Sequence, residues 1–185
     1  MWLTDPPLVI DTDFISCFAW TNRMALLTGI YQDIVVPDIV LYELAKVPHL
    51  HGRVEASIAA GAISTISIDT LDPAAAEYSR LIGGGRLGRG ESAVMAYVRF
   101  HGGTVGSNNV RDVLKYCQSN DLPLLAVRAV VVDAVDQERV FTEVAAEAFW
   151  AEMRRIRRRL PHATAMEALE HYRSGPGRQW MKQRY

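Results

Sequence analysis

The chain has 185 residues, of which 49% are hydrophobic and 22% charged, and this composition fits one globular domain with a sizeable core. Such a composition argues against a fibrous or disordered chain. The two cysteines, both in apolar surroundings, argue against a disulfide framework or a thiolate metal site. No signal peptide and no apolar run of about 18 residues is found, so we expect a cytoplasmic protein without a membrane span.

The net charge of −1 is divided unevenly along the chain. Residues 141–185 contain nine Arg or Lys and five Glu, giving +4, whereas the residues before them contain eleven basic and sixteen acidic residues, giving −5. An acidic body with a basic tail is compatible with a cation-binding pocket beside a segment that holds a polyanion. It is also compatible with chance.

The first strand-like run, residues 8–10 (LVI), ends on two carboxylates, Asp11 and Asp13. A short apolar run is typical of a buried parallel strand, and open α/β sheets place their ligands at the carboxyl ends of strands. The two carboxylates therefore indicate either a ligand site or caps of the helix that begins near Phe14, since Asp is a favoured cap.

Strands alternate with helices as far as residue 127. We expect strands at about 8–10, 34–36, 63–68, 104–106 and 123–127. We expect helices at about 14–29, 38–46, 53–60, 73–82, 91–101 and 110–119. Because alternation at this spacing produces a parallel sheet with helices on both faces, the sequence predicts an α/β fold in which a five-stranded sheet lies between two helical layers.

The pattern beyond residue 128 is helical only, with helices expected at about 129–136, 142–160 and 163–172 and a loose tail after them. We therefore divide the chain into an α/β domain, 1–128, and a C-terminal helical extension and tail, 129–185. The expected long helix carries a run of five arginines, Arg154, Arg155, Arg157, Arg158 and Arg159. Such a run is either a solvated helix face or an edge that binds phosphate or a partner.

Carboxylates follow several of the expected strands. Asp11 and Asp13 end the first strand, Glu43 lies in the helix after the second, and Glu91 and Asp112 lie in the first turns of two later helices. Because strand-to-helix junctions of a parallel sheet meet at one edge, Asp11, Glu91 and Asp112 should point into one crevice, which Glu43 could also reach. Such a cluster is tolerable only around a cation, and oxygen ligands without His or Cys select Mg²⁺ or Mn²⁺.

Four segments together resemble the acidic signature of PIN domains, especially the bacterial toxin type. They are residues 11–13 (DTD), 36–43 (VPDIVLYE), 87–91 (LGRGE) and 106–112 (GSNNVRD). The resemblance covers about residues 8–127 and implies a three-layer α/β/α sandwich of strand order 3-2-1-4-5 and a divalent-metal ribonuclease. By the matching positions, the metal-binding acids would be Asp11, Glu43, Glu91 and Asp112, with Asp13 and Asn109 next to them.

One departure concerns the fourth acid. Some PIN domains carry an acid directly after the fourth strand, where this chain has residues 107–109 (SNN). The fourth acid would then be Asp112, one turn later, as in a subset of the family. Whether a second metal binds stays open.

The acids and the resemblance together predict an endoribonuclease that hydrolyses RNA phosphodiester bonds with Mg²⁺ or Mn²⁺. We assign Asp11 to the principal metal, Glu91 and Asp112 to its inner or water-mediated shell, and Glu43 to the attacking water. The toxin resemblance further implies a small protein antitoxin that masks the acidic crevice, and a homodimer.

Several other polar residues allow two interpretations. Asn108 and Asn109 are equally well helix caps or ligands. Arg89 is an exposed loop residue or a phosphate contact beside the helix start at Glu91. Arg111 could help to position RNA, although ordinary helix surface is the simpler interpretation. The histidines share no metal-ligand spacing.

Two alternative functions remain at this point. Residues 11–13 also look like the nucleophile motif of haloacid dehalogenase-like phosphatases, in which Asp11 would be a covalent nucleophile and Asp13 a general acid. That family also needs a lysine between its motifs, and Lys46, the only lysine between residues 13 and 112, lies early. The second alternative is a non-catalytic RNA-binding or scaffold protein with the same fold, against which the full set of acids argues.

Overall fold

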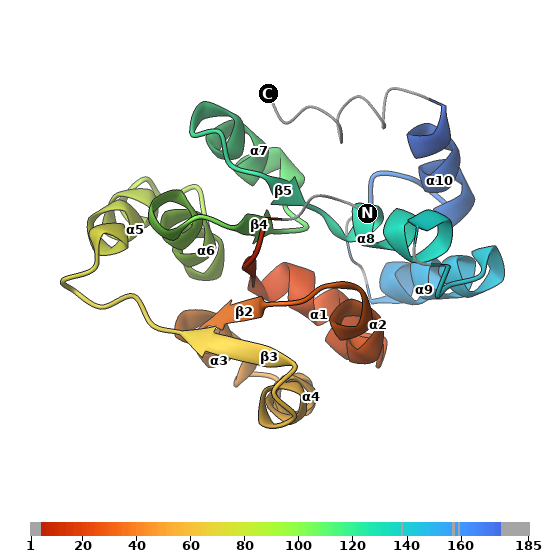
Figure 1. Cartoon of the computed structure of the whole chain (residues 1–185), viewed down its shortest axis with the longest axis horizontal. Coiled ribbons are helices and arrows are strands. Elements are labelled where there is room, and N and C mark those ends of the chain that lie inside the picture. The colour runs from red at the N-terminus through yellow and green to blue at the C-terminus, as the bar shows by residue number, and fades with distance from the viewer. Residues whose placement is uncertain (1–4, 138, 157, 159, 175–185) are drawn as a thin grey trace.

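The computed structural model describes residues 5–137, 139–156, 158 and 160–174. Five parallel strands form one sheet: β1 (Leu8–Ile10), β2 (Ile34–Pro37), β3 (Ile63–Ile66), β4 (Thr104–Gly106) and β5 (Leu124–Leu125). Their order is β3-β2-β1-β4-β5, so β1 lies at the centre of the sheet (Figure 1). The strand order that the resemblance implied is therefore confirmed.

Helices cover both faces of this sheet (Figure 1). One face carries α5 (Pro73–Gly83), α6 (Arg89–His101) and α7 (Val110–Ser119), and the other carries α1 (Thr12–Trp20), α2 (Met24–Ile30), α3 (Asp38–Leu44) and α4 (Pro48–Ala59). Because side chains alternate along a strand, Val9 packs in the core beneath α5, α6 and α7, whereas Leu8 and Ile10 pack in the core on the opposite face, beneath α1 to α4. The three-layer sandwich is confirmed.

The first helix differs from the prediction of one helix over about 14–29. It begins at Thr12 and ends at Trp20, and a second helix begins at Met24. Asn22 lies between them with a φ of 54°, in the left-handed region that Asn tolerates better than most residues. This residue turns the chain, and the apolar pattern continues on both sides of it.

The C-terminal part contains α8 (Val127–Val132), the π-helical turn η1 (Asp133–Gln137), α9 (Glu143–Arg155) and α10 (Ala165–Arg173). The helix expected over about 142–160 ends at Arg155. The loose tail expected at the C-terminal end of the chain falls on residues 175–185, which lie outside the described residues. Within the part of the chain that the structure describes, no helix is both long and apolar enough to cross a membrane.

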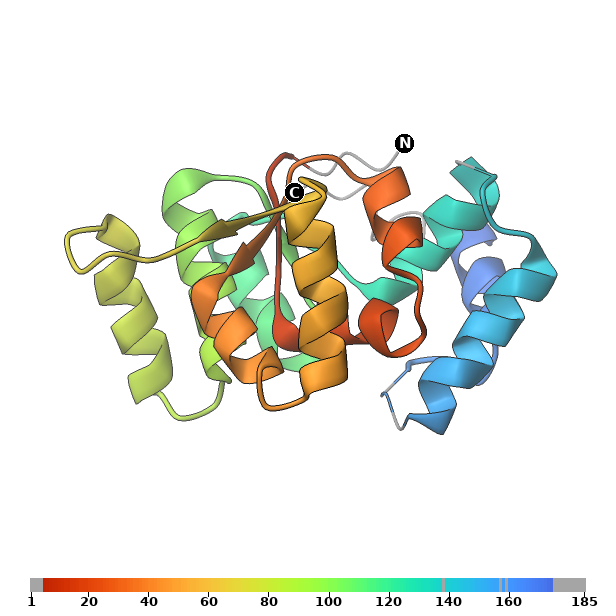
Figure 2. The same ribbon diagram turned by 90° about the horizontal axis from the view of Figure 1, so that it is seen from below.

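The C-terminal helices lie at one end of the sheet, beside α1 and α2 (Figure 2). Four fully buried residues of α9 belong to the same core as α1: Ala146, Phe149, Trp150 and Met153. The rings of Phe18 and Phe149 lie 5.6 Å apart, centre to centre. Helix α9 therefore packs directly on α1, the helix that follows β1. The division of the chain into two domains at residue 128 remains a prediction.

Candidate functional site

Asp11 lies directly after the central strand β1 and is 1% exposed. Its Oδ1 accepts a hydrogen bond of 2.7 Å from the Phe14 amide, so this side chain does cap α1. Its Oδ2 is also buried and has no hydrogen-bond partner among the described residues. Capping therefore occupies one carboxylate oxygen and leaves the other without a partner, which is costly for a buried charged group.

Burial raises the pKa of the Asp11 carboxyl from 3.8 to about 7. The Ser107 side chain and the hydrogen bond from the Phe14 amide oppose this rise, and the negative charges of Glu91 and Asp13 add to it. The site therefore holds a carboxyl group that is only partly ionised at neutral pH. A cation placed beside it would favour the ionised form.

Glu91 and Asp112 share one hydrogen-bond donor. Asn109 Nδ2 donates to Glu91 Oε1 at 2.7 Å and to Asp112 Oδ2 at 2.9 Å. The second Glu91 oxygen accepts from the Gly88 amide at 2.9 Å, which fixes Glu91 in the first turn of α6. Asn109 does not cap α7 with its side chain, so of its two interpretations the structure favours a role among the acids. The amide places a partial positive charge between two carboxylates and eases their repulsion.

Glu43 reaches the same region from α3. Its Oε1 accepts from the Gly90 amide at 3.3 Å, and its Oε2 accepts from the Thr12 hydroxyl. Thr12 follows Asp11 in the chain, and Gly90 precedes Glu91. The carboxylate of Glu43 is thus bonded to the chain neighbours of two other candidate acids, Asp11 and Glu91, which places it near them.

Gly90 leaves the space that Glu43 occupies. A Cβ added at position 90 would lie 2.9 Å from Thr12 Oγ1 and 3.0 Å from Glu43 Oε2. We expect Gly90→Ala to displace the Glu43 carboxylate and to slow RNA cleavage about tenfold or more, as substitutions behind a metal site do. Initial cleavage rates on an RNA substrate measure this effect.

The control for this prediction is Gly83→Ala, at the end of α5, where an added Cβ meets nothing within 4 Å. Both variants should keep the helical circular dichroism of the wild type, because alanine favours a helix over glycine by about 1 kcal/mol. Cleavage by Gly90→Ala at the wild-type rate would show that the position of Glu43 is unimportant.

Asp13 lies outside the buried part of the site, with its side chain 56% exposed. Its Oδ1 accepts from Arg158 Nη1 at 2.9 Å, so one member of the arginine run pairs with a predicted site residue. Another member, Arg154, donates to the Ala163 carbonyl at 2.6 Å, whereas Arg155 is exposed. The remaining two members of the run, Arg157 and Arg159, lie outside the described residues.

Three further predicted residues lie around the acids. Arg89 and Arg111 are exposed in the first turns of α6 and α7, and Asn108 is half-buried before α7. Three residues that were not predicted as site residues also contact or influence the candidate acids: Thr12, Ser107 and Gly90. All three lie inside the motif segments. For Thr12 and Ser107, a hydroxyl close in sequence to a predicted acid is the signal that could have identified them.

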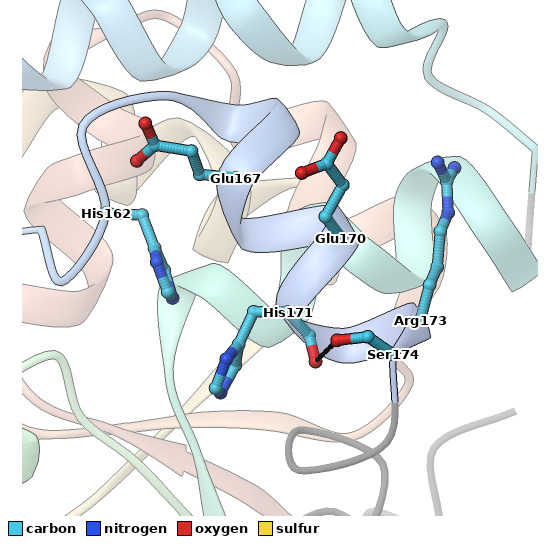
Figure 3. Close-up of a pocket in the computed structure, with 6 residues that line it drawn as sticks. All are labelled: His162, Glu167, Glu170, His171, Arg173 and Ser174. Atoms are coloured by element: carbon cyan, nitrogen blue, oxygen red, sulfur yellow. Dashed lines mark hydrogen bonds between the residues drawn. The ribbon is translucent and has the colours of Figure 1, made fainter.

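A separate pocket lies in the C-terminal part, lined by His162, Glu167, Glu170, His171, Arg173 and Ser174 (Figure 3). The rings of His162 and His171 lie 5.2 Å apart, centre to centre, and both point away from the side on which Glu167 and Glu170 lie. The histidines and the acids of this pocket therefore do not converge.

The donor chemistry of the crevice fits a hard divalent cation. As the side chains lie, no group of three or more His, Cys, Asp or Glu residues in the described ranges could hold a metal ion. The candidate donors are nevertheless all oxygens, Asp11 Oδ2 is buried without a partner, and one amide holds Glu91 and Asp112 together. Binding would require these carboxylates to turn toward one another.

Comparisons with known proteins identify the family. The family model described as DUF3368: PIN domain matches residues 7–174, which include the whole sheet, every candidate acid and the described C-terminal helices. A comparison with curated proteins gave no match. A chain of a toxin–antitoxin complex from Klebsiella pneumoniae is similar over 58% of this chain and 90% of that one. Its TM-score of 0.44 and its identity of 18% are too low to support a conclusion. On the family match, the chain belongs to the PIN-domain family.

Proposed function

We propose that this protein is a divalent-metal-dependent endoribonuclease that hydrolyses phosphodiester bonds in RNA. Members of the PIN-domain family are typically nucleases. The observation that carries the proposal is the buried Asp11 carboxyl at the end of the central strand, with one oxygen free of hydrogen bonds and the charge of Glu91 beside it. A buried acid in this state is typical of a functional site.

The candidate acids would divide the work between binding the metal and handling the attacking water. Asp11, Glu91 and Asp112 would hold Mg²⁺ or Mn²⁺, and Asp13 would lie close enough to assist. When bound, the cation supplies an activated water and stabilises the charge that develops on the leaving oxygen. Glu43 would orient the attacking water and accept its proton.

Two uncharged groups would keep these acids in place. Asn109 holds Glu91 and Asp112 through its single amide nitrogen, and the Thr12 hydroxyl holds the Glu43 carboxylate. Outer contacts of this kind fix the orientation of metal-binding side chains. Arg89, Arg111 and Asn108 are candidates for contacts with the RNA.

The experiment is an RNA cleavage assay with Mg²⁺, with Mn²⁺ and with EDTA. We expect cleavage with either metal and none in EDTA, with activity restored when Mn²⁺ is added in excess. Asp121→Asn, which changes an exposed acid after α7, serves as the control and should cleave normally. Intact RNA that binds tightly with both metals would instead support the non-catalytic RNA-binding alternative.

The family match argues against the phosphatase alternative. The family match over residues 7–174 assigns the chain to the PIN domains and not to the haloacid dehalogenase-like phosphatases. Lys46, the lysine which that alternative required, is exposed near the end of α3.

We also propose that the protein is the toxin of a toxin–antitoxin pair, with a small protein antitoxin over the acidic crevice and a homodimer as its assembly. The support is the resemblance of the four acidic segments to toxin-type PIN domains. Growth arrest on expression of the wild type, absent with Asp11→Asn, is the expected result. Light scattering of the purified protein tests the dimer.

A further inference from the structure

Tyr42 presents an exposed aromatic ring beside the candidate acids. It lies on α3 directly before Glu43, and 64% of the residue is exposed. In the turn that follows this helix, Lys46 places its Nζ 5.7 Å from the centre of the Tyr42 ring. A ring with this exposure keeps most of its surface in water, where it can contact a ligand.

Arg89 brings a second cation to the same place. It is the first residue of α6, it is exposed, and it precedes Gly90, whose amide binds Glu43. Arg89 therefore lies one residue from the amide that holds the Glu43 carboxylate, and Glu43 follows Tyr42 in the chain.

An exposed aromatic ring with Lys46 beside it and Arg89 near Glu43, next to carboxylates suited to phosphodiester chemistry, has the chemistry that binds a nucleotide. Bases stack on exposed aromatic rings, and Lys and Arg contact the phosphates that flank them. We propose that Tyr42 is the platform on which one base of a single-stranded RNA stacks, with Lys46 and Arg89 bound to the adjoining phosphates. This inference rests on the proposed function and names a residue that would contact its substrate.

The restriction to single strands follows from the geometry of stacking. A base inside an RNA duplex is already stacked on both faces, so it cannot lie on a protein ring unless the duplex opens. A single strand offers such a base at little cost. The platform therefore selects for unpaired RNA and tolerates different bases, because every base has a π-face.

The test is the binding of a fluorescein-labelled single-stranded RNA to the full chain, measured by fluorescence anisotropy. All variants carry Asp11→Asn, so that the RNA stays intact during the titration. We expect Tyr42→Ala to weaken binding about 5- to 150-fold, the range for one stacked base. Tyr42→Phe keeps the ring and should bind within about twofold of its parent.

Phe100 provides a matched control. It is an exposed aromatic residue of α6, 46% exposed, and Arg99 lies 5.6 Å from its ring centre, much as Lys46 does at Tyr42. It lies near the C-terminal end of α6, away from Glu91 in the first turn. Phe100→Ala should therefore leave RNA binding unchanged, although it removes an exposed ring with a paired cation.

Two changes to the RNA and two to the protein sharpen the test. An abasic nucleotide at the stacked position should abolish the difference in affinity between Tyr42→Ala and its parent, and a perfect duplex should show no difference at all. Lys46→Ala and Arg89→Ala should each reduce the slope of log affinity against log salt by about 0.7, the value for one phosphate on a single strand.

Each outcome decides between the platform and the proposed function. Binding by Tyr42→Ala equal to that of its parent, or an equal loss with Phe100→Ala, overturns the stacking platform while RNA cleavage by the wild type leaves the ribonuclease proposal standing. A chain that neither binds nor cleaves any RNA overturns both. Circular dichroism of Tyr42→Ala should match that of its parent, because the residue is exposed.

Discussion

Replacing Asp11 by asparagine is expected to stop RNA cleavage and to make the metal-free protein more stable at neutral pH. Asparagine caps a helix as well as aspartate does, so the bond from the Phe14 amide is kept. What is lost is a buried carboxyl whose pKa is about 7 in the folded chain against 3.8 as its ordinary value. That difference corresponds to at most about 4 kcal/mol.

The sign of the pH dependence follows from which state holds the proton. Between pH 3.8 and about 7 the folded chain keeps the Asp11 proton, whereas the unfolded chain releases it. The wild type therefore loses stability as the pH rises through this window. The asparagine of the variant does not titrate, so the advantage of the variant is largest above about pH 7 and vanishes below about pH 4.

Urea unfolding of both proteins in EDTA, at several pH values, measures this difference. RNA cleavage by Asp11→Asn should fall by at least about a hundredfold. Removal of a direct metal ligand should cost more than the loss of about 10- to 100-fold that follows when a residue supporting such a ligand is replaced. Added Mn²⁺ should raise the melting temperature of the wild type and leave that of the variant unchanged. A stability difference that does not vary with pH, or cleavage at the normal rate, would contradict the assignment of Asp11.

Replacing Phe149 by alanine is expected to destabilise the whole fold by about 3–5 kcal/mol, the cost of a large cavity in a core. Phe149 is fully buried, and its ring lies 5.6 Å from that of Phe18, which lies 5.5 Å from that of Phe14. Phe14 in turn donates its amide hydrogen to Asp11. The C-terminal helix α9 thus supports, through two rings, the helix that begins at the candidate site.

Denaturation of Phe149→Ala at equilibrium measures this cost, with Val144→Ala as its control. Val144 lies on the same helix but is 81% exposed, so its replacement should change stability by no more than about 0.5 kcal/mol. A loss below about 1 kcal/mol for Phe149→Ala would favour two independent parts that divide near residue 128. So would a stably folded chain that ends at residue 128.

The sequence predicted the features that depend on short-range patterns. The strands are short apolar runs, and every strand pair is parallel, so the junctions after the strands lie at one edge of the sheet. This is why Asp11, Glu91 and Asp112 were expected near one another, whereas the set of four acids with Glu43 came from the family resemblance. The match of residues 7–174 to the PIN-domain family supports the fold, while the roles of these four residues remain proposals.

The features that were missed depend on contacts between distant residues or on single backbone angles. Asn22 turns the chain through one left-handed residue between two apolar stretches, and the sequence was read as one helix across both, so one helix was expected where two exist. Asp13 and Arg158 are 145 residues apart in the chain, and no local pattern links them. The hydrogen bonds of the Asn109 side chain to Glu91 and Asp112 also could not be predicted, because they depend on where those two acids lie.

The most direct measurement is the position of Mn²⁺ in a crystal of the wild-type protein soaked with that ion, located by anomalous diffraction. We expect one strong signal in contact with the Asp11 oxygen that now lacks a partner, and with the carboxylates of Glu91 and Asp112. Mn²⁺ bound elsewhere, or absent at saturating concentration while RNA is still cleaved, would contradict a metal-dependent site built on these three acids.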